Sequence, residues 1–267
     1  MFDAHAPDPG YRIVPLARLT TGGRWRTEAM RSYARPLLYW FTKGQGRITV
    51  QGVTAGWGPN NAVLLPAGTM HGFDVVGQAQ GYALYLPDDP DLGLPDHPVH
   101  LRLRDAQAQA ELGGQIASIR REIEREEDCS VRALSHHAGL LMLWMERAAG
   151  PLWSGDPGRA RSADSMAQAY AALIERDLRR GRGIADFARD LGVTAAHLNR
   201  ICRQTSGRSA SALYHDRLTW EARRLLGETR MPVKDVAAAL GYSSAAYFTR
   251  AFQSRTGQTP TAFRRST

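Results

Sequence analysis

Short apolar runs alternate with turn residues over the first ninety residues of the chain. The runs, rich in β-branched and aromatic residues, are LLYWF (37–41), RITV (47–50), AVLLP (62–66) and YALYL (82–86). The turn signals between them are KGQG (43–46), GWGPNN (56–61) and PAG (66–68). Short strands at this spacing predict an antiparallel β-sandwich or a small barrel.

A helical pattern replaces the strands after a Pro- and Asp-rich crossing at 87–98. Leu112, Ile116, Ile119 and Ile123 recur at helical spacing, and residues 131–149 form a second segment that is apolar along one side. Each helix needs a partner surface, which is either the barrel or another subunit. Residues 151–164 are rich in Gly, Pro and Ser, which predicts an interdomain linker.

The segment 184–204 has the pattern of a helix-turn-helix unit. Gly192 lies where the first helix must end, since glycine enters the left-handed conformation at little cost. Val193 is expected to pack inward, and Thr194 is a suitable N-cap for the second helix. That helix is expected to present outward a set of small, amide and guanidinium side chains: Ala195, Ala196, Asn199, Arg200 and Arg203.

The same pattern returns at 233–253. Pro232 is expected to begin its first helix, Gly241 to end that helix, and Ser243 or Ser244 to cap the next one. The outward set is Ala245, Ala246, Thr249, Arg250 and Gln253, with Tyr247, Phe248 and Phe252 expected in the core. Residues 212–226 predict one continuous helix between the units, a spacer that would set two recognition helices in successive major grooves, roughly 34 Å apart.

The distribution of charge also divides the chain, at the end of the predicted linker. Residues 1–163 carry 17 basic and 17 acidic side chains, whereas residues 164–267 carry 17 basic against 9 acidic, so the whole formal excess of +8 lies in the C-terminal part. This asymmetry predicts two domains with different partners, and double-stranded DNA is the expected partner of the basic one.

Cysteines and the chain start exclude other classes. Cys129 and Cys202 are the only two cysteines, too few for a disulfide framework or a cysteine-based zinc site. The first residues lack the basic and apolar regions of a secretory signal, and no apolar stretch is long enough to cross a bilayer. We expect a cytoplasmic protein with no membrane partner.

The helical region from about Met166 to Arg265 resembles the AraC/XylS family of regulators. The motifs that carry the resemblance are IADFARDLGVTAAHLNRICRQTSGRS, RLTWEARRLL, VAAALGYSSAAYFTRAFQSRTGQTP and the closing Pro260-x-x-Phe263-Arg264. The resemblance implies DNA contacts from two recognition helices. The expected DNA-binding residues are Thr194, Ala196, Asn199, Arg200 and Arg203 in the first, and Ser244, Ala245, Ala246, Thr249 and Arg250 in the second. Family members often carry larger or polar side chains where this chain has Ala196, Ala245 and Ala246, which limits base reading there to methyl contacts.

The first ninety residues look like the cupin-type sensor barrel that many family members carry. GQGR (44–47) matches its tight hairpin and LLPAGTMHGF (64–73) its Pro-x-x-x-x-His strand. Only His71 is available in the barrel region, whereas a metal site needs three or four ligands, so we expect no metal, no cofactor and no enzyme activity. From inward alternation and similarity to arabinose-type sensors, the expected effector-lining residues are Arg35, Tyr39, Phe41, Trp57, His71, Phe73, Gln80 and Tyr82.

These observations predict a two-domain regulator. The expected parts are a cupin-like barrel with an N-terminal arm (1–105), dimerisation helices (106–150), a linker (151–164) and an all-α domain with two helix-turn-helix units (165–267). The expected function is transcription activation by a homodimer that binds DNA, senses a small-molecule effector and recruits RNA polymerase. Two alternatives stay open: a barrel that only dimerises, and a metal cupin enzyme fused to a DNA-binding unit.

Overall fold

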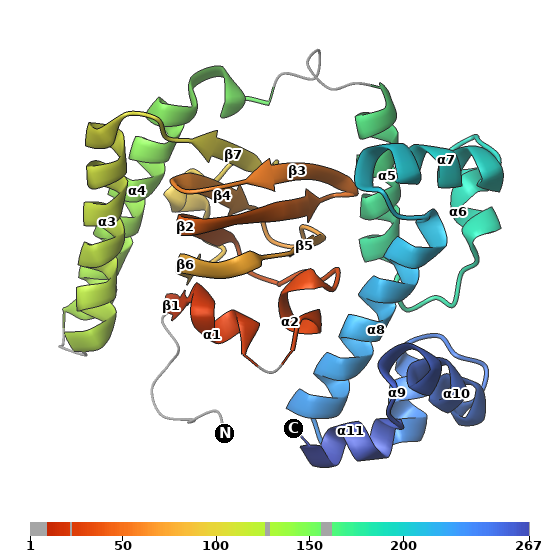
Figure 1. Cartoon of the computed structure of the whole chain (residues 1–267). Helices are drawn as coiled ribbons and strands as arrows, with labels where there is room; N and C mark the ends of the chain where they lie inside the picture. The colour runs from red at the N-terminus through yellow and green to blue at the C-terminus, as the bar shows by residue number, and fades with distance from the viewer. Residues whose placement is uncertain (1–9, 22, 126–128, 156–161, 267) are drawn as a thin grey trace.

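A computed structural model of the chain describes residues 10–21, 23–125, 129–155 and 162–266. An N-terminal sheet-rich part, called here the β domain, is followed by a pair of helices and then by a helical domain (Figure 1). The elements of the β domain are β1 (Arg12–Pro15), α1 (Leu16–Thr20), α2 (Trp25–Glu28), β2 (Leu37–Val50), β3 (Val53–Trp57), β4 (Asn61–Leu65), β5 (His71–Phe73), β6 (Val76–Tyr85), the short 3-10 turn η1 (Pro90–Leu92) and β7 (Val99–Arg102). The helix pair is α3 (Ala106–Arg125) and α4 (Ser130–Ala149), and the 3-10 turn η2 (Gly150–Leu152) follows it.

Strand β2 organises the whole sheet. It pairs antiparallel with β4 and β6 through its first half and with β3 and β5 through its second half, and β1 and β7 extend the outer edges. The turn expected at 43–46 is therefore wrong, because the chain continues through it as strand. Gly44 takes a φ of 100°, and the pairing with β6 shifts register on either side of Lys43. Such bulges bend a strand without reversing it.

The reversal comes instead at Gln51 and Gly52, which join β2 to β3. Both residues have positive φ (48° and 75°), and Val50 lies opposite Val53, as a two-residue hairpin requires. This hairpin tip points toward the helical domain, where a hydrogen bond described below holds it.

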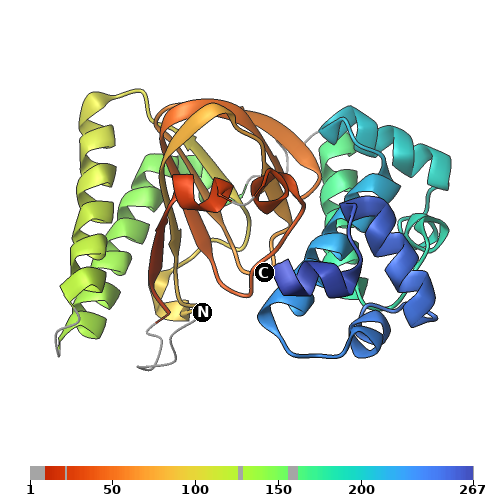
Figure 2. The same ribbon diagram turned by 60° about the horizontal axis from the view of Figure 1, so that its bottom comes forward.

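The two faces of the sheet bury different partners. Alternate residues Leu37, Tyr39 and Phe41 lie in an aromatic-rich core enclosed by the curled sheet (Figure 2), whereas Leu38 and Trp40 lie in a second core with α3 and α4. The helix pair therefore packs on the β domain, where its apolar residues Leu112, Ile116 and Ile119 are buried, with Ile123 partly buried beside them.

The helical domain is built around one long helix. Its elements are α5 (Ser162–Asp177), α6 (Ile184–Asp190), α7 (Ala195–Ser206), α8 (Ala210–Glu228), α9 (Val233–Ala239), α10 (Ala245–Thr256) and α11 (Pro260–Ser266). Helix α8 is the predicted spacer, and its Leu213, Leu218 and Leu225 lie in the common core. The expected linker 151–164 ends inside α5, and residues 156–161 of it, like residues 1–9 of the expected arm, lie outside the described residues.

The β domain and the helical domain touch along α5, α8 and the end of α7. The backbone N–H of Met30 donates to Asp216 Oδ2 (2.8 Å), and Arg217 Nη2 donates to Ser32 Oγ (2.8 Å). At the hairpin tip, Thr205 Oγ1 donates to the carbonyl oxygen of Gly52 (2.8 Å). Met30 and Met70 of the β domain belong to the same apolar core as α5–α11, so the two parts share buried surface.

Candidate nucleic-acid interface

The first helix-turn-helix unit consists of α6 and α7. Gly192 has the left-handed φ of 67° that the sequence predicted, and Val193 N–H donates back to Ala188 O (2.9 Å). Thr194 Oγ1 accepts the backbone N–H of His197 (3.1 Å), which confirms Thr194 as the N-cap of α7.

The second unit, α9 and α10, repeats the first with one change. Gly241 is left-handed (φ 75°), and Ser244 rather than Ser243 caps α10 by accepting Tyr247 N–H (3.1 Å). Pro232 is the residue before α9, so the expectation that it is the first helical residue is off by one. The second turn is one residue longer than the first, because the turn glycines are 49 positions apart whereas the caps Thr194 and Ser244 are 50 apart.

The 50-residue offset holds through the rest of each unit. Gly207 and Gly257 end the two helices with left-handed φ (71° and 76°). Ser209 and Thr259 then cap α8 and α11 with the same side-chain hydrogen bond, each accepting from the N–H three residues on (3.1 and 3.2 Å). The duplication therefore includes the start of the helix that follows each recognition helix.

Matching faces of α7 and α10 are exposed. Among the expected DNA contacts, the exposed ones are Thr194, Ala196, Arg200 and Arg203 in the first unit and Ser244, Ala246 and Arg250 in the second. Arg200 and Arg250 occupy equivalent positions at the 50-residue offset. Within the part of the chain that the structure describes, no carboxylate forms an ion pair with Arg200, Arg203 or Arg250, so these guanidinium groups are available to phosphates and base edges.

Asn199 does not face outward as expected. Its Nδ2 donates to Ala195 O (3.0 Å), and its Oδ1 accepts the backbone N–H of Ala210 at the start of α8 (3.0 Å). Both halves of the amide are therefore bound within the domain. Thr249, its equivalent, donates to Ala245 O (2.8 Å), and both alanines that receive these bonds are half-buried against the core.

Position 247 reverses a second expectation. Tyr247, expected in the core, is 53% exposed, while Phe248 and Phe252 are buried as predicted. Its equivalent His197 is half-buried and lies 3.2 Å from Arg200 (Nδ1 to Nη2). Both residues border the exposed faces. Each of them lies three residues before an arginine of the same helix face. This spacing is the sequence signal that could have placed both residues in the expected DNA-binding set.

A buried carboxylate braces the first unit. Asp177 at the end of α5 is fully buried and accepts from Arg176 (2.7 Å) and Arg182 (2.6 Å), and Arg182 also reaches Asp190 of α6 (2.7 Å). The hydrogen bond from Arg176, followed by that from Arg182, holds the pKa of Asp177 well below its usual range against the effect of burial. The entry to α6 is therefore fixed by a charged network.

Five of the expected effector-lining residues form one buried aromatic cluster inside the β domain. They are Tyr39, Phe41, Trp57, His71 and Phe73. Phe41 stacks on Trp57 with centroids 4.1 Å apart, and Tyr39 contacts Phe73 at 5.1 Å. His71 lies within reach of Tyr39 Oη (3.2 Å) and Thr69 O (2.8 Å), and burial, with the nearby Arg31 charge, lowers its pKa well below the ordinary value.

The other three expected lining residues lie elsewhere, so their inward assignment is wrong. Gln80 is exposed, and Tyr82 packs toward α3, where its hydroxyl accepts from Arg120 (2.7 Å). On β6 it is the odd positions, Ala79 and Ala83, that face the interior core. Arg35 lines a pocket between the two domains rather than the interior. Within the described ranges, no three His, Cys, Asp or Glu side chains are grouped to hold a metal ion.

Comparison with known proteins agrees with this geometry. A family model described as a helix-turn-helix domain matches residues 187–266. The chain is 32% identical over 104 residues to the probable transcription factor PqrA of Proteus vulgaris, a match that covers 38% of this chain and 85% of that protein. It is 31% identical over 115 residues to the HTH-type transcriptional regulator GlxA of Rhizobium meliloti, covering 41% of this chain and 36% of GlxA. The chain thus spans about a third of the length of the first curated relatives that it matches.

A solved structure of ToxT from Vibrio cholerae aligns with 89% of this chain and 91% of its own, at 14% identity and a TM-score of 0.43, too low to establish a shared overall fold. Two helix-turn-helix units on one spacer helix define a DNA-binding regulator of transcription. The matched domain and the similarity to PqrA show which of these regulators the chain is related to: it belongs to the AraC/XylS family. Over the described residues, no helix is both long and apolar enough to cross a membrane.

Proposed function

We propose that this chain is a sequence-specific DNA-binding transcription activator whose recognition helices are α7 and α10. The observation that carries the proposal is the equivalent placement of Arg200 and Arg250, both exposed and without an acidic partner among the described residues, on two helices fixed to one spacer. Exposed guanidinium groups on a helix that fits the major groove provide both phosphate contacts and bidentate contacts to guanine.

Selection of binding sites from random duplexes tests this proposal. The full chain should enrich two short half-sites on one face of the duplex, about one helical turn apart, because α8 sets the two helices at a fixed separation. Binding that does not distinguish the selected duplex from a scrambled one would overturn sequence-specific recognition.

In this proposal the expected DNA contacts divide into residues that meet the DNA and residues that position the recognition helices. Arg200, Arg203 and Arg250 contact DNA directly, and Ala196 and Ala246 allow close approach. Thr194 and Ser244 offer the exposed ends of their helices to phosphates. Asn199, Ala245 and Thr249 hold the recognition helices in position.

We also propose that the chain acts as a homodimer through α3 and α4. Leu140 and Leu143 on α4 are 54% and 41% exposed and border a shallow pocket beside η1. Exposed leucines side by side are characteristic of a surface that a second copy covers. Sedimentation should give a dimer for the full chain and a monomer for a Leu140→Glu, Leu143→Glu variant, and a monomeric parent chain would overturn this part.

Control by a small-molecule effector completes the proposal. The domains 1–105 and 165–267 are joined by direct hydrogen bonds as well as by the chain. A ligand that changes the contact between these domains therefore changes the placement of the recognition helices. We assign the β domain to the cupin-like sensors. Transcription with purified RNA polymerase from a promoter that carries the selected site should rise on adding the chain, and a fall would make it a repressor.

A further inference from the structure

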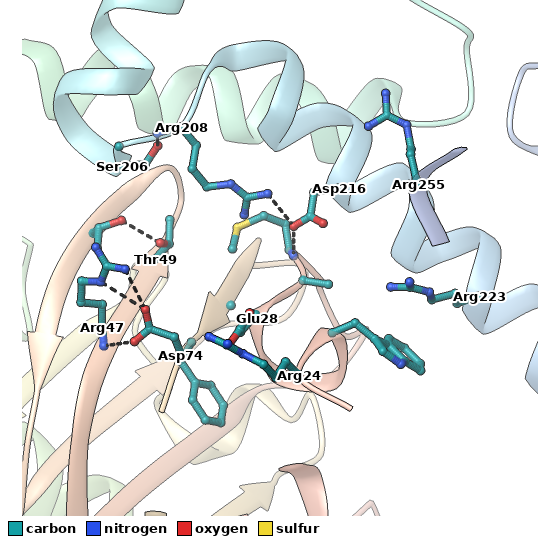
Figure 3. A pocket seen from close by; sticks show the side chains of 17 residues that line it. Arg24, Glu28, Arg47, Thr49, Asp74, Ser206, Arg208, Asp216, Arg223 and Arg255 are labelled. Atoms are coloured by element: carbon teal, nitrogen blue, oxygen red, sulfur yellow. Dashed lines mark hydrogen bonds and ion pairs between the residues drawn. The ribbon is translucent and has the colours of Figure 1, made fainter. Parts of the chain in front are cut away.

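An arginine-rich pocket of about 530 Å³ lies between the β domain and the helical domain. One wall comes from α2 and from strands β2, β3 and β5, and the other from the α7–α8 junction, α8 and α10 (Figure 3). Five arginines and three carboxylates line it. The volume is within the range of ordinary small-molecule sites.

The three carboxylates are already paired. The pairs are Arg24 with Glu28 (2.6 Å), Arg47 with Asp74 (3.0 Å) and Arg208 with Asp216 (3.1 Å). Asp216 also accepts the backbone N–H of Met30, which leaves it little capacity for a further cation. Two arginines therefore remain as excess positive charge.

These two arginines are Arg223 of α8 and Arg255 of α10, both of which line the pocket and are labelled in Figure 3. No carboxylate of the described residues lies within ion-pair distance of either one. Arg223 packs over the ring of Trp25 (4.4 Å from guanidinium carbon to ring centroid), and its buried Nε has no hydrogen-bond partner. Burial lowers the pKa of Arg223, an effect that the nearby Asp216 only partly opposes.

A buried donor without a partner is costly, and a charged one more so. Among the described residues Arg31, Arg120 and Arg223 have such an Nε, and Arg223 is the one that lines this pocket. An anion in this pocket would meet two guanidinium groups from two different helices, and Thr49 and Thr54 provide hydroxyls on the opposite wall, where they now bond to each other (2.7 Å).

We propose that the pocket is the binding site for a small anion with two or more negative charges, a carboxylate or a phosphate, held by Arg223 and Arg255, and that this anion is the effector. The regulatory half of the inference rests on the proposed function, whereas the binding half does not. The aromatic cluster inside the β domain is then core rather than ligand site, since its five rings are buried and pack against one another.

The position of the pocket connects the ligand to both recognition helices. Arg208 lies just beyond α7, Arg223 is on the spacer, and Arg255 is near the end of α10. An anion that contacts Arg223 and Arg255 on one wall and the hydroxyls of Thr49 and Thr54 on the other therefore stabilises the arrangement in which the β domain rests on the helical domain. The ligand changes DNA affinity as far as this arrangement and the DNA-bound one differ in affinity for it.

Calorimetry on the full chain tests the binding half with three probes at matched ionic strength: succinate, citrate and inorganic pyrophosphate. At least one should bind with 1:1 stoichiometry, and succinamide, which has the shape of succinate without its charge, should not bind. Arg223→Gln and Arg255→Gln should each weaken binding about tenfold or more, as loss of a charge-assisted hydrogen bond implies. Arg104→Gln removes the same charge from an exposed site outside the pocket and should change nothing.

Absence of binding by all three probes would overturn the site. Equal weakening by Arg104→Gln would also overturn it, because that result means general charge attraction. Arg255 is exposed, so its variant should fold normally and guards against a loss caused by misfolding of the Arg223 variant.

DNA affinity with and without the bound probe tests the regulatory half. The affinity for the selected duplex should change severalfold in the parent chain and not in Arg255→Gln, and an unchanged affinity would overturn the effector role. Arg200→Ala lies outside the pocket and should retain full anion binding. Failure of DNA recognition is thus distinguishable from failure of the anion site.

Discussion

Asn199 Oδ1 accepts the backbone N–H of Ala210, and at the equivalent positions of the second unit the residues are Thr249 and Pro260, which has no N–H. Ala210 is fully buried, so its amide needs an acceptor, which Asn199 provides. Proline removes that need. The two units therefore use different residues at one position for a reason that lies in the next helix.

Asn199→Ala should destabilise the protein by about 1–3 kcal/mol, because it leaves the buried Ala210 N–H without a partner. Thr249→Ala is the matched control. It breaks only the bond to Ala245 O and should cost about 1 kcal/mol or less. Urea unfolding measures both, and equal losses would contradict the role given to the Ala210 amide.

Arg200→Ala and Arg250→Ala should each weaken binding to the selected duplex by about 1–3 kcal/mol and relax selectivity at one base position. Arg230→Ala, at an exposed site between the two units, is the control for charge alone. Titration by fluorescence anisotropy measures the affinities. If all three substitutions give the same loss of affinity, the arginines act only through the overall positive charge of the domain.

Arg217→Met should destabilise the chain by about 2 kcal/mol or more, since it leaves the partly buried Glu175 without its cation and takes one of three arginines from the buried Glu221. Arg217 is 5% exposed and bonds Glu175 (2.7 Å), Glu221 (3.3 Å) and Ser32 across the domain contact. Arg189→Met removes an exposed pair with Asp186 and should cost less than about 1 kcal/mol. A similar small loss for Arg217→Met in chemical unfolding would mean that the cluster adds nothing.

Glu221 should make the chain acid-sensitive. Burial would raise its pKa, but hydrogen bonding to Arg224 and the charge of Arg217 outweigh burial and lower it from 4.5 to about 2. A depressed pKa in the folded state gives stability that is present above about pH 4.5 and is lost as the pH falls toward 2. The loss should be on the order of 3 kcal/mol.

Glu221→Gln isolates this contribution, since the variant cannot titrate. Unfolding followed against pH should show a shallower fall below about pH 4.5 in the variant than in the parent. Identical slopes would contradict the assignment. The buried His71 and the partly buried His100 are present in both proteins and cancel in the comparison.

The helical half was more predictable from sequence than the sheet. Gly192, Gly241, Thr194 and the spacer were found because capping and left-handed glycines are local requirements of the backbone. Strand β5 has three residues and β7 four, and both follow turn or Pro-rich sequence, so neither carries a pattern long enough to recognise. Their place is decided by pairing with distant strands.

The errors within the site have the same origin. Alternation predicts Tyr82 inward, but Tyr82 pairs with Trp40, which faces the helix pair, and side chains directly opposite on neighbouring strands share a face. The arginine pocket was beyond sequence reasoning, because its walls come from segments as far apart as Arg24 and Arg255. No local pattern brings them together.

Thr205 binds the hairpin through the carbonyl of Gly52, a backbone atom that is the same whatever residue stands there. The bond at the end of α7 thus depends on where the hairpin lies and not on which side chains the hairpin carries. A displacement of the hairpin by little more than an ångström would take this bond beyond hydrogen-bonding length. The contact at the end of the first recognition helix therefore responds to the shape of the β domain, and substitutions of side chains on the surface of that domain leave the contact in place.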